Sequence, residues 1–175
     1  MFRFCPACAS SAISFERGKV FRCPDCGFVF YHNTAAATGC IISVPDREAV
    51  VFLARGREPA LGKLDFPGGF VDPGEGALEG LRRECREELG WDAPPGFSFL
   101  ASFPNVYPYK GITYRTCDLF FTISVPGLSE KDFRLEEKEI ASVRFVDPRT
   151  LSFDELAFDS TRRALRAYLD KEFHR

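Results

Sequence analysis

The chain has 175 residues, of which 45% are hydrophobic and 27% are charged. These proportions are those of a globular protein, and the length allows one main core with a small appended unit. The 23 basic and 25 acidic residues leave a net charge of −2. No global positive field would attract nucleic acid or an anionic membrane, so we expect a small-molecule ligand and neither of those partners.

The first residues and the cysteines both indicate a cytoplasmic protein. Residues 1–10 contain Cys and Pro where a signal peptide needs an apolar core, and no later stretch approaches the ~20 apolar residues of a membrane span. Four of the seven cysteines fall in two Cys-x-x-Cys pairs. In a reducing compartment this spacing indicates metal binding and not a disulfide framework.

Residues 1–33 form the first predicted domain, a β zinc ribbon. Short alternating stretches at 13–15, 20–22 and 28–31 predict small hairpin strands. Such a segment is too short to bury its own core, and a structural Zn²⁺ held by four thiolates would replace that core. The predicted zinc ligands are Cys5, Cys8, Cys23 and Cys26. A redox-active pair would need a strand-to-helix context that Phe4-Cys5-Pro6 lacks, and the basic residues are few for a nucleic-acid-binding ribbon.

Residues 34–175 form the second predicted domain, of mixed α/β class. Apolar, strand-like runs are separated by turn signals, and one helix carries Leu78, Leu81, Cys85 and Leu89 as an apolar stripe. The predicted strands are 35–43, 49–54, 97–103, 114–124 and 142–146, and the predicted helices are 77–89 and 160–173.

Three acids lie on one face of the first of these helices. Glu84, Glu87 and Glu88 follow i, i+3 and i+4 spacing, after a loop rich in glycine and proline. Like charges this close repel each other. Either the face is simply solvated, or a hard cation such as Mg²⁺, which prefers oxygen ligands and bridges to phosphates, neutralises it.

The spacing around these acids decides between the two alternatives. Gly69-x5-Glu75-x7-Arg83-Glu84-Cys85-x-Glu87-Glu88-x-Gly90-Trp91 resembles the Nudix box at every specified position, with Cys85 and Trp91 in its apolar slots. The resemblance implies a Nudix α/β/α sandwich from about Thr34 onward. It also implies a metal-dependent enzyme that uses Mg²⁺ or Mn²⁺ to hydrolyse a pyrophosphate bond.

The resemblance implies roles for single residues. It makes Glu84 and Glu88 the principal metal ligands, and makes Glu87 a further ligand or the group that orients or deprotonates water. Arg83 is similar to the arginine that holds a glutamate in place. Glu75 is similar to the supporting first glutamate of the box.

Further candidates for the metal site lie outside the acidic helix. Gly69 is similar to the glycine that lets the loop fold against the helix, and the carbonyl of Gly68 joins the metal shell in relatives. A distant acid often completes such sites. Glu139 resembles it best, with Glu136 and Glu137 as rivals.

A ribbon before a Nudix box resembles the NADH pyrophosphatase branch and the zinc-ribbon hydrolases of FAD or ADP-ribose. The segment Ser102-Phe-Pro-Asn-Val-Tyr-Pro108 matches the NADH pyrophosphatase motif at Ser102, Pro104, Tyr107 and Pro108, but lacks its Gln, Trp and middle Pro. The stretch 153–160 is similar to that of FAD and ADP-ribose hydrolases. The substrate class is therefore an adenine-containing dinucleotide or ADP-sugar.

Aromatic side chains near that motif are candidates for stacking on a base, and an arginine after a strand is a candidate phosphate ligand. These substrate-binding candidates are Phe103, Tyr107, Tyr109, Tyr114 and Arg55. Relatives with this ribbon often form homodimers. Two alternatives stay open: another Nudix chemistry, such as isoprenoid isomerisation or cap removal, and a nucleotide-binding sensor without hydrolysis, which would be expected to lose box acids.

Overall fold

The computed structural model describes residues 2–173. The chain divides into two compact units, Met1–Thr34 and Ala35–Arg175, and each is described by itself.

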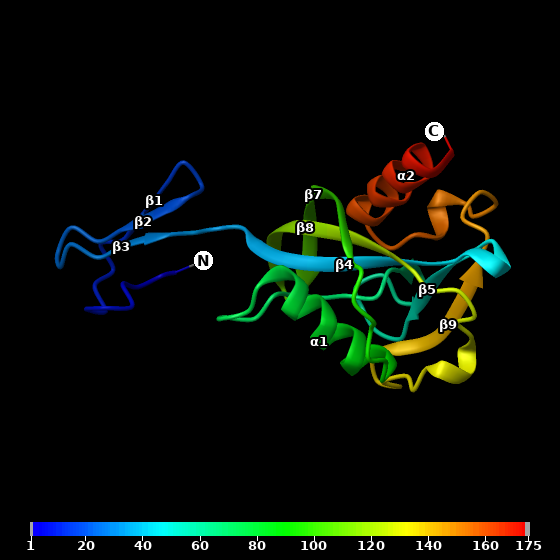
Figure 1. Ribbon diagram of the computed structural model, residues 1–175. Helices are drawn as coiled ribbons and strands as arrows, with labels where there is room; N and C mark the ends of the chain where they lie inside the picture. Colours follow the sequence, from blue (N-terminus) through cyan, green and yellow to red (C-terminus); the bar gives the residue numbers. More distant parts are fainter. Residues whose placement is uncertain (1, 174–175) are drawn as a thin grey trace. The chain divides into compact units, whose positions relative to one another are not determined.

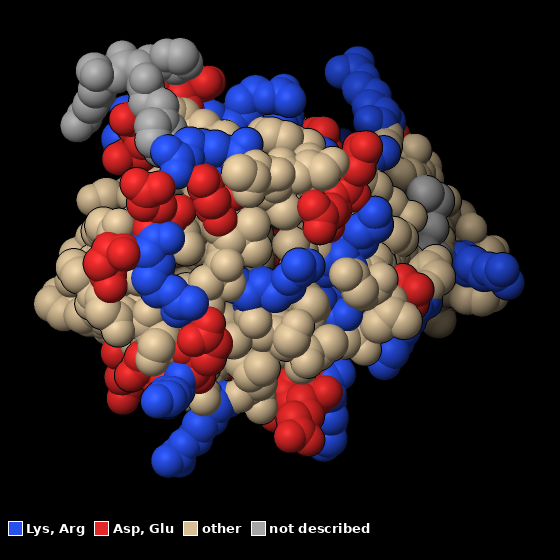
Figure 2. Space-filling model, turned by 90° about the vertical axis from the view of Figure 1, so that its right-hand side faces the viewer, with Lys and Arg blue, Asp and Glu red and all other residues tan. Residues whose placement is uncertain are grey.

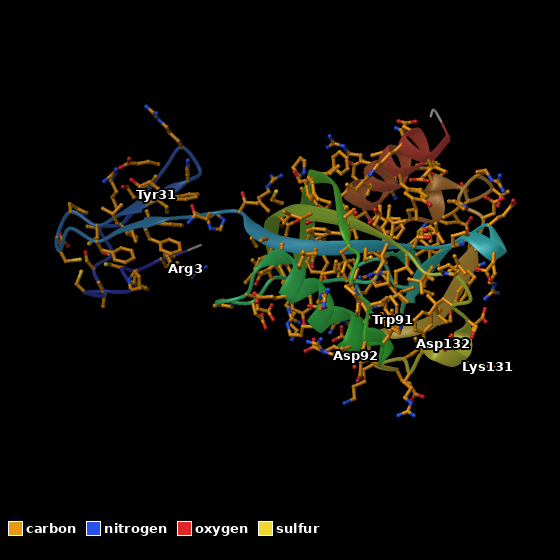
Figure 3. The ribbon with its side chains drawn as sticks, viewed as in Figure 1. Arg3, Tyr31, Trp91, Asp92, Lys131 and Asp132 are labelled. Atoms are coloured by element: carbon orange, nitrogen blue, oxygen red, sulfur yellow. The ribbon has the colours of Figure 1, made fainter. Side chains whose placement is uncertain are left out.

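The first unit is a small antiparallel sheet. Its strands are β1 (Ser14–Glu16), β2 (Val20–Arg22) and β3 (Val29–Tyr31), in the order β1-β2-β3. Its apolar interior is little more than Phe21, which is 5% exposed and contacts the rings of Phe15 and Phe2. Arg3 and Tyr31 project from this unit in Figure 3. The three short strands confirm the predicted ribbon topology.

The second unit is built on a six-stranded sheet between two helices. The strand order is β6-β5-β4-β8-β7, with β9 paired to β5, and only β4 and β8 run parallel. The elements are β4 (Ala35–Val44), η1 (Pro45–Arg47), β5 (Ala49–Arg55), β6 (Leu64–Asp65), α1 (Ala77–Leu89), β7 (Ser98–Tyr109), β8 (Ile112–Ser124), η2 (Glu130–Asp132), β9 (Ile140–Val146), η3 (Phe153–Glu155) and α2 (Asp159–Phe173).

Alternate residues of the central strands pack on opposite faces of this sheet. On β4, Cys40 and Ile42 join the cluster that contains α1, whereas Ile41 joins the cluster that contains Leu165 of α2. Figure 1 shows α1 and α2 on the two sides of the sheet. Side chains of the central strands therefore alternate between the two faces, and a helix covers each face. The unit is an α/β/α sandwich, which confirms the predicted fold class.

Helix α1 differs from the prediction in its apolar stripe. Leu81, Cys85 and Leu89 are buried as expected, but Leu78 is 40% exposed. Ala77, four residues before Leu81, packs against the core instead. The stripe follows i, i+4 spacing throughout, and one residue of offset turns Leu78 about 100° away from the sheet.

The β7–β8 hairpin is longer than the sequence predicts at both sides of its turn. β7 continues past Phe103 to Tyr109, and β8 begins at Ile112 instead of Tyr114. The added part of β7 contains two prolines, Pro104 and Pro108. Because β7 is an edge strand, prolines can be placed where no ladder N–H is needed.

Charged residues are mixed over the face shown in Figure 2, where Lys and Arg alternate with Asp and Glu. Trp91, which fills an apolar slot of the box, is buried and meets the ring of Phe133 edge-on, with ring centroids 6.1 Å apart. Among residues 2–173, no helix is long and apolar enough to cross a membrane.

Candidate active site

The loop between β6 and α1 is tied to strand β4 through two glycines. Thr38 N–H donates to the carbonyl of Gly69 at 2.8 Å, and Cys40 N–H donates to that of Pro67 at 2.9 Å. A Cβ on Gly68, whose φ is +145°, would lie 2.1 Å from the carbonyl oxygen of Thr38. Only glycine lets the backbone of this loop approach the strand so closely.

The same loop meets the carboxylates of α1. Gly68 N–H donates to Glu88 Oε2 at 2.8 Å. A Cβ on Gly69 would lie 2.5 Å from Glu84 Oε1. The two glycines therefore let the loop backbone lie directly against two of the three acids that the sequence singled out.

Arg83 connects the carboxylates of the box. Its Nε and Nη2 donate to the two oxygens of Glu75 at 2.9 and 3.1 Å, and its Nη1 donates to Glu84 at 2.8 Å and Glu87 at 2.9 Å. Nη2 also donates to the carbonyl of Phe70 at 2.8 Å. The planar guanidinium thereby fixes three carboxylates and the loop in one arrangement.

The carboxylates differ in their electrostatics. Hydrogen bonds from Arg83 lower the pKa of Glu75. Burial raises the pKa of Glu84 in spite of Arg83, and burial raises the pKa of Glu88 well above its usual range, with Glu84 nearby adding to the effect. Two partly buried carboxylates whose ionised forms are disfavoured suit a divalent cation, because its charge would offset their desolvation and repulsion.

These acids line a cavity of about 350 Å³ in the second unit. Gly68, Gly69, Glu84, Glu87 and Glu88 contribute to one side of it. The size is within the usual range for a small-molecule pocket.

Glu139 enters the cavity from a different segment. It lies just before β9, and its Oε2 is 2.6 Å from Nη2 of Arg57, another lining residue. Glu136 and Glu137 are exposed and are not among the lining residues. Of the three rival acids, the structure brings only Glu139 to the box carboxylates.

The substrate-binding candidates are divided by the structure. Arg55, Tyr107 and Tyr109 line the cavity, whereas Phe103 and Tyr114 are not among its lining residues. Phe103 packs near Phe120 under the guanidinium of Arg163. The ring of Tyr114 lies 5.9 Å from that of Phe70, which is a lining residue.

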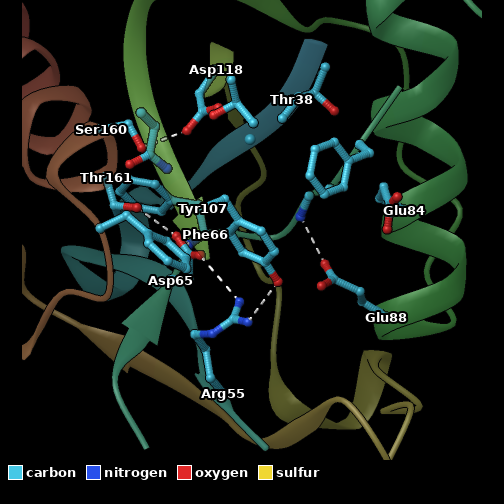
Figure 4. A pocket seen from close by; sticks show the side chains of 18 of the residues that line it. Thr38, Arg55, Asp65, Phe66, Glu84, Glu88, Tyr107, Asp118, Ser160 and Thr161 are labelled. Carbon is cyan, nitrogen blue, oxygen red and sulfur yellow. Dashed lines mark hydrogen bonds and ion pairs between the residues drawn. The ribbon is translucent and has the colours of Figure 1, made fainter. Parts of the chain in front are cut away.

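Arg55 is held firmly at the wall of the cavity. It donates from Nε to the carbonyl of Pro59 at 2.7 Å and from Nη2 to Tyr107 Oη at 3.4 Å, and its Nη1 lies 3.6 Å from Asp65. Its guanidinium also lies over the ring of Phe158, 5.1 Å from the centroid. Figure 4 shows the contacts of Arg55 with Tyr107 and Asp65.

Sequence reasoning missed a group of carboxylates and hydroxyls that also line the cavity. Thr161 Oγ1 donates to Asp65 at 2.7 Å, and Ser160 Oγ donates to Asp118 at 2.6 Å, so the first turn of α2 meets the sheet here (Figure 4). A signal was present in β8, where Thr116 and Asp118 alternate with the apolar Phe120 on one strand face and both are buried.

The cysteines of the first unit form a separate site. The four sulfur atoms lie within 4.8 Å of one another, with Cys5 and Cys26 Sγ 3.6 Å apart and Cys8 and Cys23 Sγ 3.7 Å apart. Four thiolates around one zinc ion at 2.3 Å would be separated by about 3.8 Å. The four thiols thus fit a tetrahedral zinc site that has no open position.

Comparison with known proteins identifies the second unit. The NUDIX domain family matches residues 33–168. The chain belongs to the Nudix hydrolase family. The resemblance found in the sequence is thereby confirmed, and Glu84, Glu87 and Glu88 of the box line the cavity of a Nudix fold.

Individual Nudix proteins give the extent of the similarity. The chain is 31% identical over 108 residues to the NAD-capped RNA hydrolase NudC of Stutzerimonas stutzeri (strain A1501), a match covering 62% of this chain and 38% of that protein. It is 30% identical over 101 residues to the U8 snoRNA-decapping enzyme of Homalodisca vitripennis, covering 54% of this chain and 53% of that protein. The chain thus spans about half or less of these relatives' length.

A solved structure extends the likeness to both units. The Nudix hydrolase from Nitrosomonas europaea aligns with a TM-score of 0.71 and 22% identity, over 99% of this chain and 93% of that one. At this identity the likeness concerns the fold alone.

Proposed function

We propose that this protein is a pyrophosphohydrolase, which hydrolyses the pyrophosphate bond of a nucleoside diphosphate linked to another group and releases a nucleoside monophosphate. The observation that carries the proposal is the convergence of Glu84, Glu87, Glu88 and Glu139 on one cavity. A bound divalent cation supplies charge neutralisation at the pyrophosphate and lowers the pKa of a water molecule.

The residues of this chain have distinct roles in the proposal. Glu84 and Glu88 are the principal ligands of the cation. Glu139, which lies just before β9, is a further ligand. The carbonyl of Gly68 is a further ligand. It lies between the carbonyls of Pro67 and Gly69, which accept hydrogen bonds from β4.

Glu87 and Arg83 position the reacting groups. Glu87 is the most exposed of the three helix acids, with 58% of its side chain accessible, so it is the one open to an incoming water. It serves as a further ligand or as the group that orients that water. Arg83 fixes the carboxylates and keeps its own proton, because the hydrogen bonds that it donates to Glu75 raise its already high pKa.

The substrate we propose is an adenine-containing dinucleotide or ADP-sugar of the NADH, ADP-ribose or FAD class. Arg55 and Arg57 are the cations at the cavity available to a pyrophosphate, and Tyr107 and Phe70 offer aromatic faces beside them. The same bond occurs in an NAD-capped RNA. Because one relative is named an NAD-capped RNA hydrolase, a capped RNA 5′ end is a second candidate, although the net charge of −2 argues against extensive RNA contact.

The test is product release from NADH, NAD⁺, ADP-ribose, FAD, diadenosine polyphosphates and a short NAD-capped RNA, with Mg²⁺ or Mn²⁺. Wild-type protein is compared with Glu88→Gln and with Glu137→Gln, a surface change outside the cavity. We expect one substrate class to be cleaved, a loss of several orders of magnitude in Glu88→Gln, and no change in Glu137→Gln. Tight binding of a nucleotide with no cleavage would instead support the sensor alternative.

A further inference from the structure

Three residues that line the cavity, Thr38, Thr116 and Asp118, carry a buried polar atom that has no partner among residues 2–173, and the last two lie together on β8. Asp118 is 9% exposed and Thr116 is 3% exposed, and both line the cavity. Ser160 donates to Oδ2 of Asp118, but among residues 2–173 nothing pairs with Asp118 Oδ1 or with Thr116 Oγ1. A buried acceptor without a partner destabilises the folded state, so such groups concentrate where a ligand pairs with them.

The neighbouring strand leaves space above these groups. Thr116 pairs with Ala35 and Asp118 with Ala37 across the parallel β4–β8 ladder, so each polar residue faces a small side chain. Further along the same face Gly39 faces Phe120, and a Cβ there would lie 2.8 Å from the Phe120 ring. The β4 side of this floor is therefore built from residues too small to cover Asp118 and Thr116.

The walls beside this floor are aromatic. Phe66 and Phe120 are 3% and 4% exposed and line the cavity together with Tyr107 and Phe158. Flat apolar walls that end in a carboxylate oxygen and a hydroxyl suit a planar ring whose edge carries a hydrogen-bond donor. Adenine has such an edge, because its exocyclic amino group donates and the adjacent ring nitrogen accepts.

We propose that Asp118 and Thr116 bind the amino edge of the substrate's nucleobase. Asp118 Oδ1 accepts an N–H of the exocyclic amino group, and Thr116 Oγ1 donates to the neighbouring ring nitrogen. Ser160 occupies Oδ2 of the carboxylate, so Oδ1 is the oxygen left for the base. This assignment rests on the proposed function, since it takes the ligand to be a nucleotide, and it adds base specificity to that function.

The test measures binding of AMP and IMP by calorimetry, with the zinc-loaded protein and Mg²⁺. These monophosphates differ at the amino position, where IMP carries a carbonyl oxygen that would face the carboxylate. We expect wild-type protein to bind AMP about tenfold or more tightly than IMP. In Asp118→Asn the amide can turn its NH₂ toward the cavity, so the preference should vanish or reverse.

A second pair of variants tests the same site in case the Asp118→Asn protein does not fold. Thr116→Val removes an unpaired buried hydroxyl at nearly constant volume, so we expect an equal or higher melting temperature together with weaker AMP binding. Thr122→Val lies on the same strand face, is partly buried and does not line the cavity, so its AMP affinity should match wild type.

Equal wild-type affinity for AMP and IMP would overturn the assignment, as would a lower melting temperature with unchanged AMP affinity in Thr116→Val. Neither readout requires hydrolysis. A protein that selects AMP through Asp118 but cleaves no dinucleotide would refute the proposed reaction and leave the base site standing.

Discussion

Arg83 and Glu75 are joined by two parallel hydrogen bonds, from Nε to Oε1 at 2.9 Å and from Nη2 to Oε2 at 3.1 Å. This fork leaves Nη1 directed at Glu84 and Glu87. A lysine has no planar fork and cannot hold Glu75 and both helix acids at once.

Arg83→Lys should therefore lower kcat by about 10- to 100-fold, the usual effect of losing a group that orients metal ligands. Because the charge is kept, the melting temperature should change little. The measurement is steady-state kinetics together with thermal unfolding. Arg82→Lys is the matched control, because Arg82 is on the same helix but lies over the ring of Phe97. Equal losses in the two variants would contradict a specific role for Arg83.

Glu139 and Glu137 offer a direct test of the distant metal ligand. Glu139→Gln removes a carboxylate that lines the cavity, so the Mg²⁺ concentration for half-maximal activity should rise about tenfold or more. Glu137→Gln removes an exposed carboxylate two residues away and should leave it unchanged. The measurement is a Mg²⁺ titration of activity at saturating substrate. An unchanged Mg²⁺ requirement in Glu139→Gln would remove this residue from the metal site.

Asp65 gives a pH dependence of stability. Burial raises its pKa from 3.8 to about 6, against hydrogen bonding by Thr161 and the charge of Arg55. Between these two values the folded protein binds more protons than the unfolded chain. The free energy of unfolding therefore falls as pH rises from about 4 to about 6, by up to about 3 kcal/mol.

Asp65→Asn removes this titration but keeps an acceptor for the Thr161 hydroxyl. Its stability relative to wild type should increase as pH rises from 4 to 7.5, and the increase should level off above about pH 7. Denaturant unfolding at several pH values, without Mg²⁺, measures the difference. A difference that does not vary with pH would show that the folded pKa of Asp65 is close to its unfolded value.

The four-cysteine cluster predicts one zinc ion per chain. Cys23 is 2% exposed within the cluster, and Cys23→Ser should bring the zinc content of purified protein from about one ion to near zero and destabilise the first unit. Elemental analysis measures the ion and limited proteolysis measures the unit's stability. Cys117→Ser changes an exposed cysteine outside the cluster and should retain the full zinc content.

The carboxylate cluster on α1 could be predicted from sequence because it is local. Glu84, Glu87 and Glu88 lie within two turns of one helix, and Gly69 and Glu75 precede it at fixed distances along the chain. Helical geometry then determines which side chains share a face. Glu139 was identified among three acids by resemblance, and only the structure shows which of the three faces the cavity.

The part of the cavity wall around Asp118 could not be predicted because it is assembled from distant segments. Asp118, Asp65 and Ser160 come from β8, β6 and α2, and their proximity depends on how α2 docks on the sheet. Phe103 illustrates the same limit, since 19 Phe residues in the chain give no local sign of which line a cavity and which pack in the core. Leu78 shows that a one-residue offset in a helix is enough to change burial.

The parallel pairing of β4 with β8 also bears on how the protein folds. Ala35 pairs with Thr116, so closing this ladder joins segments separated by most of the second unit. Bringing two such distant segments together loses chain entropy before the new hydrogen bonds stabilise the structure. This pairing therefore slows folding relative to a chain of local hairpins. During synthesis α1 is made well before β8 and α2 emerge. We expect its carboxylates to become a defined cluster only late, when the central ladder and the C-terminal helix close together.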